Sequence, residues 1–403
     1  MTNDTITAPR AAEQGARADM SWRVHARRFY LAFHRWTGLI LGAIFVVVGL
    51  TGALLSFAPQ IDAALHPQLL RSTPPSTDAP YASLDEIYAA AIADLPRDAT
   101  PSFLAMPRGG EGVVSLSYRL RDADDVTETH RVFVDPYTTK VTGDRTIKKG
   151  DDEIRQFFFN SVRSLHYTLW QGSDRSWLVG GPALVLLPSM ILGIALWWPR
   201  PGQWRLAFAI KRKASAERRI FDLHRVVGAL VAIVLCCSLT SGCFFVFRQQ
   251  GRDLIRLVSS VREAPRGLAS RPIADHDPIG LDAALRIAER SFPGAAPTGF
   301  SLPANAKGVY VVSMRTQDEP NHANGRNRVT IDQFSGQVLF TEDRSAFSAG
   351  ERFLEWLLPL HSGEAFGLGG HVVIFLAGLA PAFLYVTGFI RWRQQRRRRA
   401  VSA

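Results

Sequence analysis

Four of the ten histidines occupy positions that are related by spacing along the chain. His34 and His224 begin the similar segments H-R-W-T-G (residues 34–38) and H-R-V-V-G (residues 224–228), 190 positions apart. His166 and His361 each follow a leucine and lie 195 positions apart. Neutral imidazole is a good ligand for iron, copper and zinc. One histidine from each of two facing helices is typical of a b-type haem held inside a helical bundle.

We expect these histidines to form two sites at opposite ends of helices about 30 Å long. His34 with His224 would hold the iron of an inner haem b, and His166 with His361 that of an outer haem b. Zinc is disfavoured, because neither pair has the cysteine or carboxylate partners of a four-ligand site. For one histidine alone, an interfacial residue with a satisfied ring is the simpler interpretation. Four at duplicated positions near membrane segments favour a functional one.

Three further residues are candidates for these sites. His371 follows His361 by ten positions and is an alternative outer ligand, although its counterpart in the first half is Ser176. Arg35 and Arg225 directly follow the inner histidines. Their side chains either contact haem propionates or extend to the phosphate headgroups of lipids.

The histidines need helices to position them, and the sequence provides four apolar segments. Residues 36–58, 177–198, 226–247 and 372–390 contain no Asp, Glu, Lys or Arg and are 23, 22, 22 and 19 residues long. At a rise of about 1.5 Å per residue, each can cross a hydrocarbon layer of about 30 Å as a helix. Buried helices of a soluble protein rarely exclude charge over such lengths. We therefore predict an integral membrane protein in a lipid bilayer.

Charged residues predict the orientation of these spans. Residues 1–35, 199–225 and 391–403 carry 20 Lys and Arg residues against five acidic ones. Residues 59–176 carry 13 basic and 17 acidic residues, and residues 248–370 carry 14 of each. Because excess Lys and Arg beside spans mark the cytoplasmic side, both termini are expected in the cytoplasm. The net charge of +11 then reflects topology, and nucleic acid is not an expected partner.

Each half of the chain therefore has the order span, external domain, span, in a parallel repeat about an axis along the membrane normal. The predicted fold class is an all-α membrane core of four transmembrane helices with two periplasmic α+β domains. The predicted divisions are a cytoplasmic tail (1–33), transmembrane helix 1 (34–58), a first periplasmic domain (59–176), helix 2 (177–198), a basic cytoplasmic loop (199–223), helix 3 (224–247), a second periplasmic domain (248–370), helix 4 (371–391) and a cytoplasmic tail (392–403).

The two external domains share one pattern. Each begins with an amphipathic helix, at residues 83–95 and 281–291, and continues with strand-like runs at residues 113–120, 131–135, 308–314 and 328–331. Asp135-Pro136 and Asp332…Gly336 are typical of turns between strands. A small α+β module is predicted in each half.

Four segments resemble the PepSY-associated transmembrane family of bacterial inner-membrane proteins. They are L-A-F-H-R-W-T-G (31–38), V-D-P-Y-T-T-K-V (134–141), F-D-L-H-R-V-V-G (221–228) and L-P-L-H-S-G-E-A-F-G-L-G-G (358–370), and the resemblance covers residues 30–393. It implies PepSY-like periplasmic domains over a four-helix core with b-type haem, as in ferric-siderophore reductases. It places His34, His224, His166 and His361 at the family's histidine positions. Thr139 departs from the family's turn pattern D-P-x-T-G, and Asp332-Gln333 lacks its proline.

The expected function is transmembrane electron transfer that reduces a periplasmic ferric siderophore or other ferric chelate, which would make the protein an oxidoreductase. No G-x-G-x-x-G fingerprint for a dinucleotide is present, so a cytoplasmic donor or a membrane quinol must supply the electrons. The alternative is a membrane-anchored PepSY binding or regulatory protein, for peptidase inhibition or sensing, with incidental histidines. A proton-coupled transporter is disfavoured, because no carboxylate lies within the spans.

Overall fold

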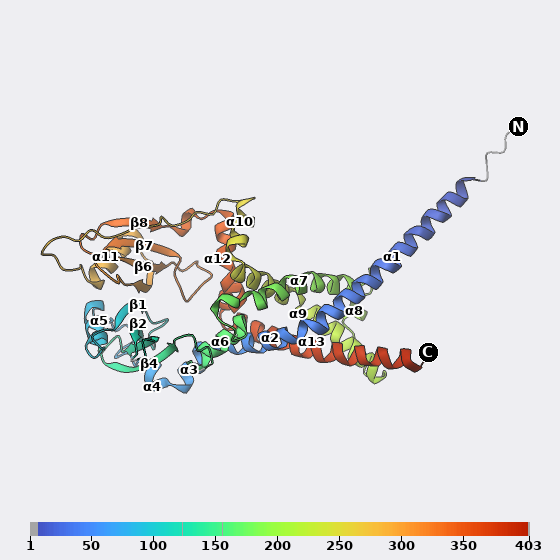
Figure 1. Ribbon diagram of the computed structural model, residues 1–403, viewed down its shortest axis with the longest axis horizontal. Helices are drawn as coiled ribbons and strands as arrows, with labels where there is room; N and C mark the ends of the chain where they lie inside the picture. The colour runs from blue at the N-terminus through green and yellow to red at the C-terminus, as the bar shows by residue number, and fades with distance from the viewer. Residues whose placement is uncertain (1–6, 123, 155, 402–403) are drawn as a thin grey trace. The chain divides into compact units, whose positions relative to one another are not determined.

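The computed structural model describes residues 7–122, 124–154 and 156–401, so the first six and last two residues of the predicted tails lie outside the described part. The chain divides into two compact units. The helical unit comprises the chain up to Ala53, Trp177–Val246 and the chain from Leu376. The sheet unit comprises Leu54–Ser176 and Phe247–Phe375. Figure 1 labels the helices and strands of both in chain order.

Long apolar helices make up the helical unit. These are α1 (Thr7–Ile40), α2 (Gly42–Ser56), α7 (Trp177–Trp197), α9 (Ala216–Val246) and α13 (Gly367–Val401), with the short α8 (Trp204–Ala207) between α7 and α9. Within the described residues, α7, α9 and residues 364–398 are each long and apolar enough to cross a membrane. The pair Val24–Ile40 and Gly42–Ser56 provides a fourth candidate if it is one span.

The first span differs from the straight helix expected at residues 34–58. Its two parts are bent by 58° at a break around Leu41. The Leu41 amide still donates to the Thr37 carbonyl at 2.9 Å, so the chain turns without losing that hydrogen bond. His34 lies on the α1 side of this bend.

Small residues allow the helices of this unit to approach closely. A Cβ atom on Gly49 of α2 would lie 2.5 Å from the Gly378 carbonyl oxygen of α13, so a larger residue does not fit there. Such contacts are typical of helix packing in membranes. Other apolar side chains of this unit are exposed, such as Ile191 of α7 (56% exposed) and Ile233 of α9 (75%). Apolar surface of this kind needs lipid to cover it.

The sheet unit contains an eight-stranded antiparallel sheet in the order β4-β3-β2-β1-β5-β6-β7-β8. The strands are β1 (Thr100–Ala105), β2 (Val114–Arg121), β3 (Thr127–Val134), β4 (Val141–Lys149), β5 (Ala296–Ser301), β6 (Val309–Arg315), β7 (Asn327–Asp332) and β8 (Val338–Glu342). Its helices are α3 (Ala58–Leu65), α4 (Pro67–Leu70), α5 (Leu84–Ile92), α6 (Phe158–Thr168), α10 (Arg248–Arg256), α11 (Leu281–Ser291) and α12 (Ala349–Ser362). Three 3₁₀ turns complete it: η1 (Ser173–Arg175), η2 (Arg344–Ala346) and η3 (Glu364–Phe366).

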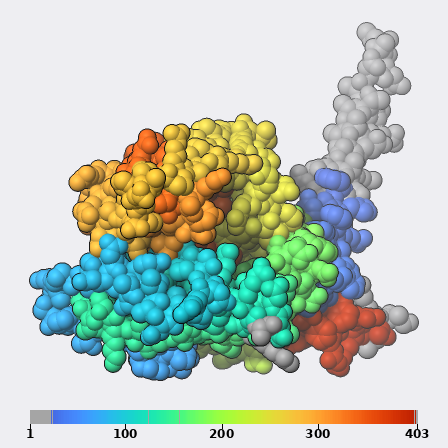
Figure 2. All heavy atoms as spheres, turned by 60° about the vertical axis from the view of Figure 1, so that its left-hand side comes forward, coloured from blue at the N-terminus to red at the C-terminus, as the bar shows by residue number. Residues whose placement is uncertain are grey.

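The two modules expected from the sequence are joined in this single sheet. β1 pairs with β5, with Leu104 opposite Phe300 in the register. Both side chains are fully buried in one hydrophobic cluster to which the two modules contribute. The residues of the two modules lie against each other in the space-filling view (Figure 2). The α+β module of each half is therefore not an independent domain.

Helices α5 and α11 exchange their N-terminal hydrogen bonds. Asp282 of α11 accepts from the Leu84 amide at 2.9 Å, and Asp85 of α5 accepts from the Leu281 amide at 2.6 Å. A carboxylate at a helix N-terminus satisfies unpaired amides and interacts favourably with the helix dipole. Each module thus caps the helix of the other, which reinforces the β1–β5 junction.

Candidate functional site

Helices α1 and α9 of the helical unit bring the inner pair, His34 and His224, together. The ring centroids lie 6.4 Å apart and the ring planes are inclined by 76°. The 190-residue separation in the sequence is closed because α1 and α9 both pack against α7, and each histidine occupies the same position of the repeat.

The Nδ1 atoms of the inner pair have hydrogen-bond partners on the other two spans. His34 Nδ1 lies 2.9 Å from the backbone carbonyl oxygen of Ser189 on α7, which can only accept. His224 Nδ1 lies 2.9 Å from Thr387 Oγ1 on α13, and that hydroxyl donates its proton to the Phe383 carbonyl at 2.8 Å. The His34 ring therefore carries its proton on Nδ1, and the same tautomer of His224 completes the hydrogen bond to Thr387. Nε2 retains its lone pair, which is the tautomer that binds a metal.

Two glycines leave space beside these rings. A Cβ atom on Gly193 of α7 would lie 2.9 Å from His34 Cε1, and one on Gly388 of α13 would lie 3.5 Å from His224 Cε1. The two glycines are 195 positions apart, the same separation as His166 and His361. Sequence reasoning did not identify these glycines, Ser189 or Thr387. An alignment of the second span with the fourth would have identified the glycines.

The outer pair, His166 and His361, meets in the sheet unit. His166 lies on α6 and His361 on α12, with ring centroids 6.1 Å apart and planes inclined by 75°. Both histidines lie in the last turn of their helices. The left-handed Leu169 (φ 55°) ends α6, and Gly363 (φ 83°) ends α12.

His371 has contacts of its own in this arrangement. Its Nδ1 lies 3.1 Å from the Ser362 carbonyl oxygen, and its Nε2 lies 3.6 Å from a carboxylate oxygen of Glu364. The His371 ring is also 5.9 Å from the Phe57 ring. Of the two outer candidates, the structure brings His361 to His166 and ties His371 to the turn before α13.

The guanidinium groups of Arg35 and Arg225 have contacts for only some of their N–H donors. Arg225 Nη2 donates to the carbonyls of Leu206 and Ala209 at 3.2 and 2.9 Å. The Arg35 guanidinium lies 5.7 Å from the Trp36 ring centre. The Nε atoms of both arginines are buried and have no hydrogen-bond partner among the described residues. Each retains a donor for an anionic group such as a propionate.

The spacing of both pairs fits an iron atom between the rings. Two metal–nitrogen bonds of about 2 Å, with about 1 Å from each nitrogen to its ring centre, separate the centroids by about 6 Å. The observed values are 6.4 and 6.1 Å. In the described part of the chain, no three His, Cys, Asp or Glu residues are grouped to hold a bare metal ion. A pair of histidines suits an iron whose other ligands come from a macrocycle.

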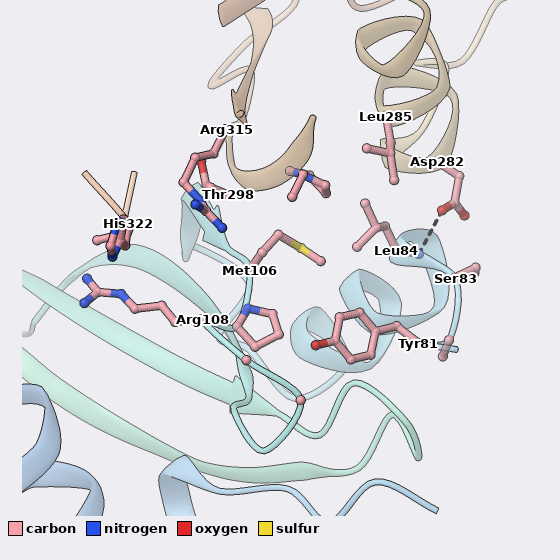
Figure 3. Close-up of a pocket in the computed structure, with 17 residues that line it drawn as sticks. Tyr81, Ser83, Leu84, Met106, Arg108, Asp282, Leu285, Thr298, Arg315 and His322 are labelled. Carbon is pink, nitrogen blue, oxygen red and sulfur yellow. Dashed lines mark hydrogen bonds between the residues drawn. The ribbon is translucent and has the colours of Figure 1, made fainter. Parts of the chain in front are cut away.

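The sheet unit also has two cavities related by the duplication. One, of about 580 Å³, has Leu84, Arg108, Arg315 and His322 in its lining (Figure 3). The other, of about 520 Å³, contains Leu281 at the position equivalent to Leu84. Their described lining residues include no member of either histidine pair.

A comparison with protein families matched the model of the PepSY-associated TM region over residues 31–395. This match spans most of the chain and confirms the resemblance seen in the four sequence segments. No curated protein matches the chain. The chain belongs to the PepSY-associated TM region family and is a multi-pass membrane protein.

Proposed function

We propose that the protein is a di-haem b electron carrier that reduces ferric chelates, such as ferric siderophores, on the periplasmic side of the bacterial inner membrane. The observation that carries this proposal is the geometry of two separate histidine pairs, each with ring centroids slightly more than 6 Å apart. The inner pair has both Nε2 lone pairs free for iron. When bound, haem supplies reversible one-electron transfer at each pair.

The residues of this chain have defined roles in the proposal. His34 and His224 hold the inner iron, and His166 and His361 the outer iron. The Ser189 carbonyl and the Thr387 hydroxyl fix the orientation of the inner rings through Nδ1. Arg35 and Arg225 provide donors for propionates at the inner site. His371 positions the turn between α12 and α13.

Reduction of the chelated iron releases it, because hard-oxygen siderophores hold Fe²⁺ more weakly than Fe³⁺. The electron donor is external to this chain, either a cytoplasmic reductant or a membrane quinol. The proposed orientation has both termini in the cytoplasm and the sheet unit in the periplasm.

The test is the visible spectrum and haem content of the full-length protein purified from membranes. We expect two haem b per chain, with low-spin spectra that show two imidazole ligands on each iron. The dithionite-reduced protein is expected to be reoxidised by a ferric chelate. Protein that is fully folded but free of haem would overturn the proposal and favour a PepSY binding or regulatory role.

A further inference from the structure

Strands β3 and β4 place two arginines directly opposite each other. Arg131 of β3 is the register partner of Arg145 of β4. Like charges at opposed positions destabilise a sheet. Arg145 has a partner, because its Nη1 donates to both carboxylate oxygens of Asp62 on α3 at 2.8 and 3.1 Å. Arg131 has none among the described residues, and its Nε is buried.

A third arginine, Arg163 of α6, adds to this positive charge. Burial and the nearby charges of Arg163 and Arg145 lower the pKa of Arg131, while Asp62 raises it. Asp62 is shared further, because it also accepts from His66 Nδ1 at 2.8 Å. Arg131, Arg145 and Arg163 are here called the arginine cluster. Among the described residues, Asp62 is the carboxylate that faces it.

Helix α6 is held against β4 beside this cluster. Asn160 Nδ2 donates to the Ile147 carbonyl at 3.4 Å, and the Arg145 guanidinium lies 4.3 Å from the centre of the Phe157 ring. These contacts fix the start of α6 on the strand that carries Arg145. The positive charge of Arg145 therefore lies where α6 packs on the sheet.

The second half of the chain has the same framework without the excess charge. Arg131 and Arg328 are each opposite a serine on the preceding strand, so they are equivalent. Arg328 is opposite Glu342 of β8 and lies 3.6 Å from its carboxylate. At the position equivalent to Arg163, 195 residues later, α12 has Leu358. At these equivalent positions of the described chain, the first half has two opposed arginines and the second half has an arginine opposite a glutamate.

The arginine cluster adjoins the outer histidine pair. Arg163 precedes His166 by three residues on α6, and residues three apart share one face of a helix. We propose that the arginine cluster binds the carboxylates of a ligand that lies against His166. The guanidinium groups of Arg131 and Arg163 donate charge-assisted hydrogen bonds to it. The identity of the ligand rests on the proposed function: the carboxylates are outer-haem propionates or belong to a ferric chelate such as iron(III) citrate.

The test uses Arg163→Leu, which copies Leu358 of the second half, and Arg131→Gln, which removes the opposed charge. The matched control is Arg121→Leu, which breaks an exposed ion pair with Asp125 on the same sheet. Full-length protein is titrated with gallium(III) citrate, which cannot be reduced, and with a neutral gallium(III) trihydroxamate. Haem release is measured separately, as the rate of transfer from each site to apomyoglobin.

If a chelate is the ligand, both variants bind gallium(III) citrate about tenfold more weakly than the wild type and the control. If propionates are the ligand, outer-haem release is about tenfold faster in both variants and inner-haem release is unchanged. Unchanged citrate affinity together with unchanged haem release overturns the inference. Haem-free protein would refute the proposed function, and the gallium titration alone would then decide this inference. If Arg131→Gln fails to fold, Arg163→Leu on the exposed face of α6 decides it.

Discussion

In the proposed function the four histidines form two independent pairs, His34 with His224 and His166 with His361. Single substitutions should therefore separate the two sites. His224→Ala removes a ligand of the inner iron and is expected to eliminate about half of the haem. His166→Ala is expected to remove the other half. Each variant should lose ferric reduction, because the electron path is interrupted at one end or the other.

His371→Ala is the matched control for these variants, because His371 lies in the outer turn but is bonded to Ser362. It should retain both haems. Haem per chain, measured as the pyridine haemochrome of each purified variant, decides the matter. Loss of outer haem in His371→Ala with full content in His361→Ala would show that the ligand assignment is wrong.

Thr387 provides a finer test of the inner site. Its hydroxyl accepts from His224 Nδ1 while donating to Phe383, and valine keeps the shape without the acceptor. Loss of such an outer partner typically costs about 10- to 100-fold in metal affinity. We expect Thr387→Val to accelerate haem release from the inner site by about that factor and to leave the outer site unchanged.

The control for Thr387→Val is Thr51→Val on α2, whose hydroxyl donates to the Val47 carbonyl of its own helix at 2.8 Å. Haem transfer to apomyoglobin from both proteins is the measurement. Equal inner-site release rates in the two variants would remove Thr387 from the proposed site.

At the scale of elements, α12 carries His361 and is anchored at its start. Ser348 and Glu351 form a capping box, and Arg262 donates to both Glu351 oxygens at 3.0 Å. These hydrogen bonds from Arg262 lower the pKa of the Glu351 carboxyl from 4.5 to about 2. The side chain of Glu351 is only 10% exposed, but that of Arg262 is 55% exposed, so solvent partly screens the pair.

The stability that Glu351 contributes should therefore depend on pH. Its pKa is lower in the folded chain than in the unfolded chain, so the contribution is complete above pH 4.5 and disappears as the pH falls toward 2. We expect Glu351→Gln to lower the free energy of unfolding by about 1–3 kcal/mol at pH 7. The unfolding temperature should fall accordingly, and the effect should be smaller at pH 3.

Thermal unfolding of the full-length protein in detergent, followed by circular dichroism at both pH values, measures this. Glu111→Gln is the control, because the Glu111 residue is exposed. An equal loss of stability at pH 3 and pH 7 would show that the carboxylate charge is not the cause.

At the scale of the whole molecule, the duplication and the positive charge near the spans predict topology. Residues 59–176 and 248–370 are expected in the periplasm, because they lack the basic excess of the flanking segments. Reporter fusions at Gly110 and Lys307 should behave as exported, and a fusion at Lys211 as cytoplasmic. A cytoplasmic signal at Gly110 would refute the orientation and place the outer pair on the wrong side for a periplasmic acceptor.

Two equivalent turns of the sheet unit have the same backbone conformation although their residues differ. Thr139 and Gly336 occupy equivalent turns and both are left-handed, with φ values of 55° and 71°. Glycine adopts this conformation readily, whereas a β-branched residue does so at a cost. The departure from the family pattern at Thr139 therefore changes the residue and leaves the turn in place.

Features with a local signal can be predicted from the amino-acid sequence. Charge-free segments show the spans, because length and apolar composition alone decide whether a helix can cross a bilayer. The repeated H-R-x-x-G segments relate His34 to His224, and the structure places their rings 6.4 Å apart. In the sheet unit, the expected helix at residues 281–291 is the observed α11, because its amphipathic pattern is regular.

Features that depend on contacts between distant residues could not be predicted from the sequence. Strands β1 and β5 escaped prediction because Pro101 and Pro297 disfavour strands, and each lies at an irregularity in the register where proline is tolerated. Their pairing joins the two modules. The contact of His361 with His166 and the Nδ1 partners of the inner pair likewise depend on packing between segments far apart in the chain. The sequence around each residue does not indicate which distant residues will contact it.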